Sequence, residues 1–220
     1  GADRVAGQAH AHRQGRQGEP VRAWGADGSS LTEVADRVAW ISGRSSAAHA
    51  ALAPAQQALI ARAVPYGFVP VTTGFPFRPD EGAWTKAGLI SASVRNGMQY
   101  AALRWHRPTL RQVAARLEPL LRLTRDRLLV VCGSLGLELF VRGLRAQGMP
   151  SCLIRIVALG PVCAAPVDGL DLRAAQAPTD VLSRLHYAGP VQIRPRCRHL
   201  DYVHDREVAD LVTHAAKDPW

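Results

Sequence analysis

The chain has 220 residues, 47% of them hydrophobic, which is enough for one ordinary domain with a sizeable core. No apolar run approaches the roughly 18 residues that a membrane span needs, and the first residues lack the apolar segment of a secretory signal, so we expect a cytoplasmic or already processed protein. The formal net charge is +9. The arginines are scattered along the sequence and aromatic residues are few, which disfavours a nucleic-acid-binding surface. The excess of arginine reflects either the base composition of the genome or attraction to an acidic protein partner.

The N-terminal half predicts a tail followed by alternating strands and helices. Residues 1–19 contain few large apolar side chains, so we expect a mobile tail there and a single domain over 20–220. A helical turn near 31–36 is an alternative start to the strand that we expect from residue 37, because Ser30 and Glu33 have the spacing of a capping box. The expected elements of this half are strands at 19–24, 37–43 and 67–75 and a helix within 47–64.

The C-terminal half continues the alternation. One or two helices are expected within 86–105, then a helix capped by Thr109, and finally a helix capped by Asp205. Several of the intervening strands are apolar throughout, which predicts a parallel sheet buried on both faces and therefore an α/β fold with a mostly parallel central sheet. The remaining expected elements are strands at 128–132, 152–162, 171–177 and 190–195 and a helix from residue 137.

A short stretch between strand and helix carries the chemistry. Leu128 to Cys132 is apolar, and Gly133, Ser134, Leu135 and Gly136 then lead directly into a helical pattern. A serine on such a corner is a candidate nucleophile, although the same serine could simply cap the helix. The sequence Cys132-Gly133-Ser134-Leu135-Gly136 resembles the small-x-Ser-x-small nucleophile elbow of the α/β-hydrolase family, with Cys in place of the usual first Gly.

The order of elements from residue 20 to residue 216 also resembles that family, and the resemblance implies a Ser, Asp, His order for a catalytic triad. Asp180, in the segment Ala-Pro-Thr-Asp-Val-Leu-Ser, matches the position of the acid, although alone it could be only a helix cap. His199, in His-Leu-Asp-Tyr ahead of the last helix, matches the base. The competing candidates are Asp168, Asp171, His186 and His204.

The resemblance further implies two oxyanion donors, the backbone N–H groups of Leu135 and Arg44. Arg44 follows Ser42 and Gly43, where the family often has His-Gly, and Gly43 would lie against the substrate. Little room exists for a lid between residues 161 and 172. Phe75 and Trp84 are candidates to line an acyl pocket, or they only pack helices against the sheet.

Cofactors and metals are not expected. The cysteines at 132, 152, 163 and 197 form no Cys-x-x-Cys pair, and the histidines do not cluster. Reduced thiols are therefore the default, with a Cys163–Cys197 bridge left open. The interpretation is a serine hydrolase that cleaves a carboxylic ester or thioester, small or carrier-bound, through an acyl-enzyme. The departures at Cys132 and Ser42 motivate the alternative, an inactive hydrolase-fold protein that binds a ligand or partner.

Overall fold

A computed structural model gives the fold and describes residues 23–24, 30–43, 52–71, 73 and 89–220. The predicted tail over 1–19 and most of the first predicted strand lie outside these ranges. Within the described ranges, none of the helices has the length and apolar character that crossing a membrane requires.

A five-stranded sheet forms the centre of the molecule, and every neighbouring pair of its strands is parallel. Its order is β4-β3-β5-β6-β7, so the strand that precedes Ser134 is the central one. A separate antiparallel pair, β1 and β2, lies nearer the N-terminus. The strands are β1 (Ala23–Trp24), β2 (Ser30–Leu31), β3 (Val34–Ser42), β4 (Val69–Pro70), β5 (Thr124–Gly133), β6 (Leu153–Leu159) and β7 (Asp171–Ala175).

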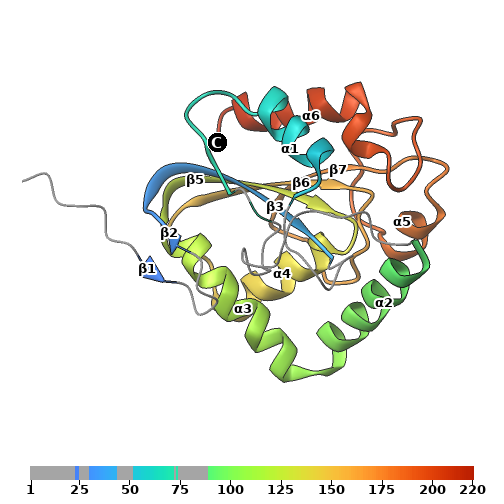
Figure 1. Cartoon of the computed structure of the whole chain (residues 1–220), viewed down its shortest axis with the longest axis horizontal. Helices are drawn as coiled ribbons and strands as arrows, with labels where there is room; N and C mark the ends of the chain where they lie inside the picture. Colours follow the sequence, from blue (N-terminus) through green and yellow to red (C-terminus); the bar gives the residue numbers. More distant parts are fainter. Residues whose placement is uncertain (1–22, 25–29, 44–51, 72, 74–88) are drawn as a thin grey trace, which may run out of the picture.

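Helices cover both faces of this sheet (Figure 1). On one face α1 packs beside α6, and α2, α3 and α4 cover the other. This arrangement confirms the predicted α/β class with a parallel central sheet. The helices are α1 (Pro54–Ala63), α2 (Leu89–Trp105), α3 (Arg107–Arg122), α4 (Gly136–Gln147), α5 (Val181–His186) and α6 (Arg206–Lys217), with a 3-10 turn, η1, at Tyr202–His204.

The two layers have separate cores because strand side chains alternate between the faces. In β3, Ala39 and Ile41 join the core under α2, α3 and α4. Val38 and Trp40 join the core under α1 and α6. All four are at most 2% exposed, which explains why this strand is apolar throughout its second half rather than alternating.

Four sequence expectations differ from the structure. The alternative of a helical turn near 31–36 is wrong, because Leu31 belongs to β2 and β3 begins at Val34, which pairs with Thr124 of β5. The predicted strand at 190–195 is reduced to one parallel bridge between Ala175 and Ile193, since prolines at both ends of the segment have no N–H for a ladder.

The third difference is the start of α3. His106, not Thr109, is its N-cap, and the His106 ring accepts a hydrogen bond from the Thr109 N–H. Pro108 in the first turn favours a start at this point. The expected strand at 67–75 is shorter among the described residues: Val69–Pro70 forms the strand at the sheet edge, and Thr73 makes an isolated bridge.

A buried arginine fastens the end of α6 to the sheet. Arg155 on β6 is only 4% exposed and forms an ion pair with Asp171 at 2.6 Å. Its remaining N–H groups donate to the carbonyl oxygens of Ala215, Asp218 and Pro219. The charge is therefore fully paired, which is the condition for burying a guanidinium without a large desolvation cost.

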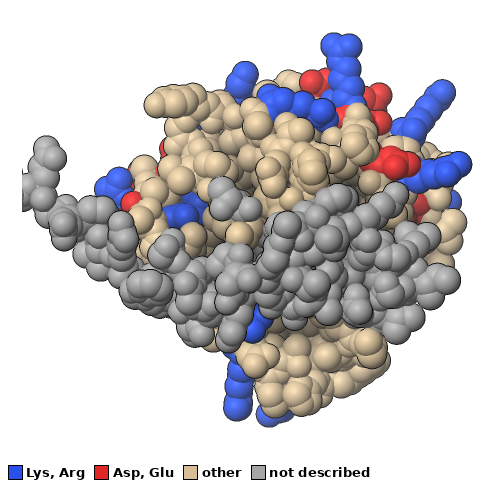
Figure 2. Space-filling model, in the orientation of Figure 1, with Lys and Arg blue, Asp and Glu red and all other residues tan. Residues whose placement is uncertain are grey.

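Positive charge is dispersed over the face shown in Figure 2. Lys and Arg side chains project separately from several edges of this face, and Asp and Glu side chains lie among them at the top right. The scattered arginines of the sequence therefore remain scattered on this surface.

The first turn of α4 approaches β3 so closely that only glycine fits at residue 136. A Cβ built on Gly136 would lie 2.0 Å from the Ile41 carbonyl oxygen. Because that neighbour is backbone, we expect Gly136→Ala to lower the free energy of unfolding by at least about 2 kcal/mol. Chemical denaturation measures it.

Gly97 provides the matched control. It is exposed in α2, and a Cβ there would meet nothing within 4 Å, so Gly97→Ala should raise stability by about 0.5–1 kcal/mol. Equal effects of the two alanines would contradict the close approach.

Candidate active site

Ser134 lies on a strained corner between β5 and α4. Its φ is 50°, and it is the one non-glycine residue with positive φ in the described part of the chain. Such a backbone costs about 1–3 kcal/mol and persists where surrounding contacts fix it. Here the Ser134 N–H donates to the Leu159 carbonyl at 3.0 Å, and the Val162 N–H donates to the Ser134 carbonyl at 3.0 Å. The corner is thus held by β6 and by the loop that follows it.

The small residues of the elbow have different roles. Gly136 is the site of the close approach to β3 described above, and a Cβ on Gly133 would lie 3.1 Å from the Trp40 ring. Cys132, where a family member would usually have glycine, is fully buried in the core under α2, α3 and α4. The larger side chain is accommodated there as an ordinary core residue, and burial raises the pKa of its thiol.

Three polar side chains from distant segments meet at the carboxyl end of the sheet. His199 Nε2 lies 2.9 Å from Ser134 Oγ. His199 Nδ1 lies 2.9 and 2.8 Å from the two carboxylate oxygens of Asp180. Ser134 does not cap α4, since the N-cap is Leu135 and no side chain caps it. The imidazole therefore bridges the hydroxyl and the carboxylate.

Asp180 is buried and held by several donors. Its side chain is 0% exposed, and it accepts hydrogen bonds from the Ser183 N–H at 3.0 Å and the Tyr202 hydroxyl at 2.8 Å as well as contacting His199. Burial raises the pKa of Asp180, but these hydrogen bonds outweigh burial, so its pKa is lowered overall. Asp180 thus caps α5 and contacts His199 at the same time, which unites the two interpretations that the sequence left open.

Tyr202 is a residue that sequence reasoning missed. Its hydroxyl donates to Asp180 Oδ2 and accepts from the Ala177 N–H at 2.8 Å, so it holds one carboxylate oxygen while the Ser183 N–H of α5 holds the other. The fit is close, because a Cβ on Gly160 would lie 2.6 Å from the tyrosine ring and 2.7 Å from Asp180 Oδ2. The motif His-Leu-Asp-Tyr contains Tyr202, but no spacing rule points it toward a residue 22 positions earlier.

The competing candidates lie elsewhere. Asp171 is paired with Arg155, and Asp168 lines a surface cavity. His186 contacts the Tyr100 ring edge-on at 5.7 Å, while His204 is exposed at the end of η1. None of these four contacts Ser134.

The candidate oxyanion and substrate residues are only partly described. Leu135 directly follows Ser134 at the start of α4, where the first backbone N–H groups of a helix have no intrahelical acceptor. Gly43 follows β3, whose last residue, Ser42, is in register with Gly133. Arg44, Phe75 and Trp84 lie outside the described residues.

A buried carboxylate on α4 fixes the loop that follows β6. Glu138 is 0% exposed and accepts from Arg142 at 2.6 Å and from the Ala164 and Ala165 N–H groups at 2.8 and 2.9 Å. Burial raises the pKa of Glu138, but its hydrogen bonds lower it by more. The same loop contains Val162, which binds the Ser134 carbonyl, so Glu138 supports the corner indirectly.

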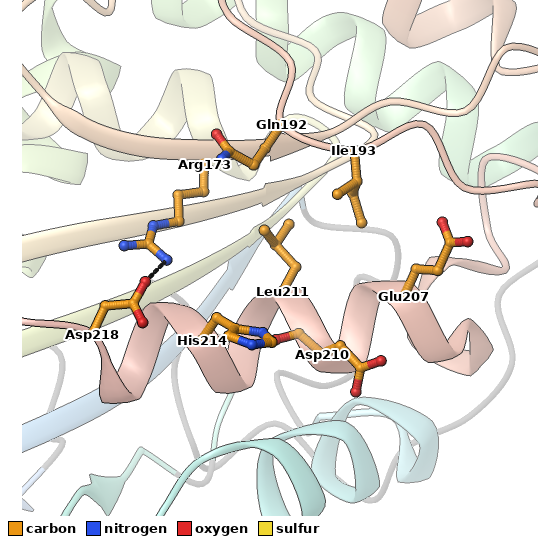
Figure 3. Close-up of a pocket in the computed structure, with 8 residues that line it drawn as sticks. All are labelled: Arg173, Gln192, Ile193, Glu207, Asp210, Leu211, His214 and Asp218. Atoms are coloured by element: carbon orange, nitrogen blue, oxygen red, sulfur yellow. Dashed lines mark hydrogen bonds and ion pairs between the residues drawn. The ribbon is translucent and has the colours of Figure 1, made fainter.

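A cavity of about 430 Å³ lies between β7 and α6 (Figure 3). An ion pair between Arg173 and Asp218 crosses it at one end. Ser134, Asp180 and His199 do not line it.

Metal ligands and disulfides are the remaining site features considered from the sequence. Among the described residues no group of three or more His, Cys, Asp or Glu side chains could hold a metal ion. The four cysteines, Cys163 and Cys197 included, are free thiols.

No protein-family model matches the chain, and no curated protein matches it. Among solved structures, the chain is similar to XC6422 from Xanthomonas campestris, an α/β serine hydrolase without a lid, at 14% identity and a TM-score of 0.40, over 90% of this chain and 91% of that chain.

Replacement of Tyr202 by Phe should destabilise the protein in a pH-dependent way. The variant loses a hydrogen bond to a buried carboxylate, a contact of about 1.5–3 kcal/mol. Because Tyr202 helps to hold the pKa of Asp180 below its ordinary 3.8, part of this stabilisation is present above that pH and disappears as pH falls through the folded pKa. Urea unfolding should show a loss of about 2 kcal/mol at pH 7.

The difference in unfolding free energy between the two proteins should narrow at pH 3. A residual difference is expected at every pH, because the variant leaves the Ala177 N–H without its acceptor. A difference of the same size at both pH values would exclude a charge-dependent role for the hydroxyl.

Proposed function

We propose that the protein is a serine hydrolase that cleaves a carboxylic ester or thioester through an acyl-enzyme. One observation carries the proposal: a single imidazole lies within hydrogen-bond distance of the Ser134 hydroxyl on one side and of a buried carboxylate on the other. A serine hydroxyl becomes a useful nucleophile when a positioned base accepts its proton. The resemblance of the elbow and of the loops around Asp180 and His199 to the α/β-hydrolase family supports the same assignment.

The proposed reaction follows from this arrangement. Ser134 Oγ attacks the carbonyl carbon while its proton passes to His199 Nε2. The tetrahedral intermediate then collapses, and the leaving alkoxide or thiolate takes that proton from His199. Water next attacks the acyl-enzyme, gives a proton to His199, and releases the carboxylic acid as the proton returns to Ser134.

Asp180 would act through His199. Its lowered pKa keeps the carboxylate ionised at neutral pH, where it fixes the Nδ1–H tautomer and stabilises the imidazolium that forms during each transfer. The Leu135 N–H, at the positive end of the α4 dipole, would donate to the oxyanion. Arg44 remains the proposed second donor.

A fluorophosphonate probe tests the assignment directly. The wild-type protein should become labelled at Ser134, because the probe phosphonylates a serine hydroxyl, with loss of fluoride, only when a base activates it. Ser134→Ala should abolish labelling, and His199→Ala should slow both labelling and the hydrolysis of p-nitrophenyl acetate by about 10⁴-fold or more. Mass spectrometry of the labelled peptide identifies the residue.

His204→Ala is the matched control, since this exposed histidine lies five residues from His199 and does not contact Ser134. It should be labelled at the wild-type rate. A folded wild-type protein that remains unlabelled would instead favour the alternative of a hydrolase-like protein that binds a ligand or partner without turnover.

A further inference from the structure

An exposed apolar stripe begins directly beside the candidate triad. Val181 follows Asp180 at the start of α5 and is 62% exposed, and Leu185, four residues later, is 75% exposed. Residues four apart lie one above the other on a helix face. Leu182, on the adjoining position, is 46% exposed. Large apolar side chains grouped on a surface in this way mark a binding site more often than isolated ones do.

The stripe leads into a cavity. A space of about 690 Å³ lies between the second half of α2, the loop after β6 and the end of α5, and Leu185 is part of its wall. Tyr100 and Arg104 line it from α2, and Arg184 lines it from α5. The volume falls in the range of small-molecule sites, which are typically about 300–1,000 Å³.

Backbone hydrogen bonds connect this cavity to the Ser134 corner. The Val162 N–H donates to the Ser134 carbonyl. The next residue, Cys163, lines the cavity and donates its N–H to the His186 carbonyl at the end of α5. From the Asp180 cap to His186 the helix advances roughly 9 Å at 1.5 Å per residue. The part of the cavity wall that His186 forms therefore lies roughly 9 Å along α5 from the Asp180 cap, a length that a medium-length acyl chain can span.

The cavity is positively charged. The Arg104 guanidinium donates to the Tyr100 hydroxyl at 2.9 Å and lies over the Tyr100 and Trp105 rings at 5.5 and 5.7 Å. Arg184 donates to the Pro178 carbonyl at 3.1 Å. Neither forms an ion pair with a carboxylate of the described residues, and Asp168 is the one acidic side chain in the lining. The lining residues thus include two arginines and one aspartate.

We propose that the substrate is an ester or thioester whose acyl chain ends in an anionic group, a carboxylate or a phosphate. The apolar part of the chain lies along Val181, Leu182 and Leu185, and the terminal anion binds Arg104 and Arg184. This inference rests on the proposed function of Ser134. The acyl chain stays attached through both chemical steps, so these contacts hold the ester and the acyl-enzyme alike. Planar guanidinium groups are well suited to carboxylate and phosphate oxygens.

Matched chromogenic esters test the proposal. The p-nitrophenyl monoester of nonanedioic acid is compared with p-nitrophenyl nonanoate, which has the same chain length and a neutral end. Each kcat/KM is divided by the value of the same protein for p-nitrophenyl acetate. The wild type should prefer the anionic ester by about tenfold at low salt, and the preference should fall as sodium chloride screens the charges.

The double variant Arg104→Gln/Arg184→Gln should lose this preference. The control Arg111→Gln/Arg206→Gln, which removes two exposed arginines outside the cavity, should keep it. Leu185→Glu, which adds a carboxylate to the wall of the cavity, should shift the ratio toward the neutral ester. Equal rates for the two esters in the wild type, or a preference that survives in the double variant, would overturn the proposal.

A binding measurement separates this outcome from failure of the proposed function. Titration of monomethyl nonanedioate into Ser134→Ala protein, followed by calorimetry, requires no chemistry at Ser134. Binding that Arg104→Gln/Arg184→Gln weakens about tenfold supports the anion site even if p-nitrophenyl acetate is not hydrolysed. Absent or unaltered binding in a hydrolytically active protein overturns the anion site alone.

Discussion

The site depends on one ring with two hydrogen-bonding nitrogens. His199 reaches Ser134 with one nitrogen and Asp180 with the other. Ser134 directly follows β5, whereas Asp180 and His199 both lie in segments after β7. The parallel sheet makes this meeting feasible, because parallel strands all end at the same edge and the loops that follow them converge there. If the strands were in a different order, the same three side chains would be present but would no longer lie within hydrogen-bond distance of one another.

Some features around the His199 ring destabilise the fold, and neighbouring hydrogen bonds compensate for them. Ser134 has a strained backbone, and burial disfavours the charge on Asp180. The compensating contacts are backbone hydrogen bonds to the serine from β6 and the loop after it, and hydrogen bonds donated to the carboxylate by Tyr202 and α5. Strain next to reactive groups, with dense support behind it, is the pattern expected of a functional site rather than of an accidental turn.

The parts of the site that are encoded locally could be predicted from sequence. The corner at Ser134 has its own signature, because the strand, the small residues and the helix are contiguous and the close approach to β3 permits only glycine at residue 136. The contact of Tyr202 with Asp180 is not encoded in this way, since it depends on how two loops pack. The apolar pattern near Ile193 predicted a full strand, but the prolines on either side limit the pairing to one bridge. The N-cap at His106 was missed because it depends on a ring nitrogen, and histidine ranks low as a capping residue.

The position of His199 along the chain has a consequence for biosynthesis. All five strands of the parallel sheet precede residue 176, whereas the imidazole and α6, which Arg155 fastens to β6, are translated later. A nascent chain can thus assemble its sheet and expose the Ser134 corner while the hydroxyl still lacks its proton acceptor. Reactivity at that hydroxyl would emerge only when the C-terminal segment docks, so that covalent capture of Ser134 reports the completion of folding rather than its onset.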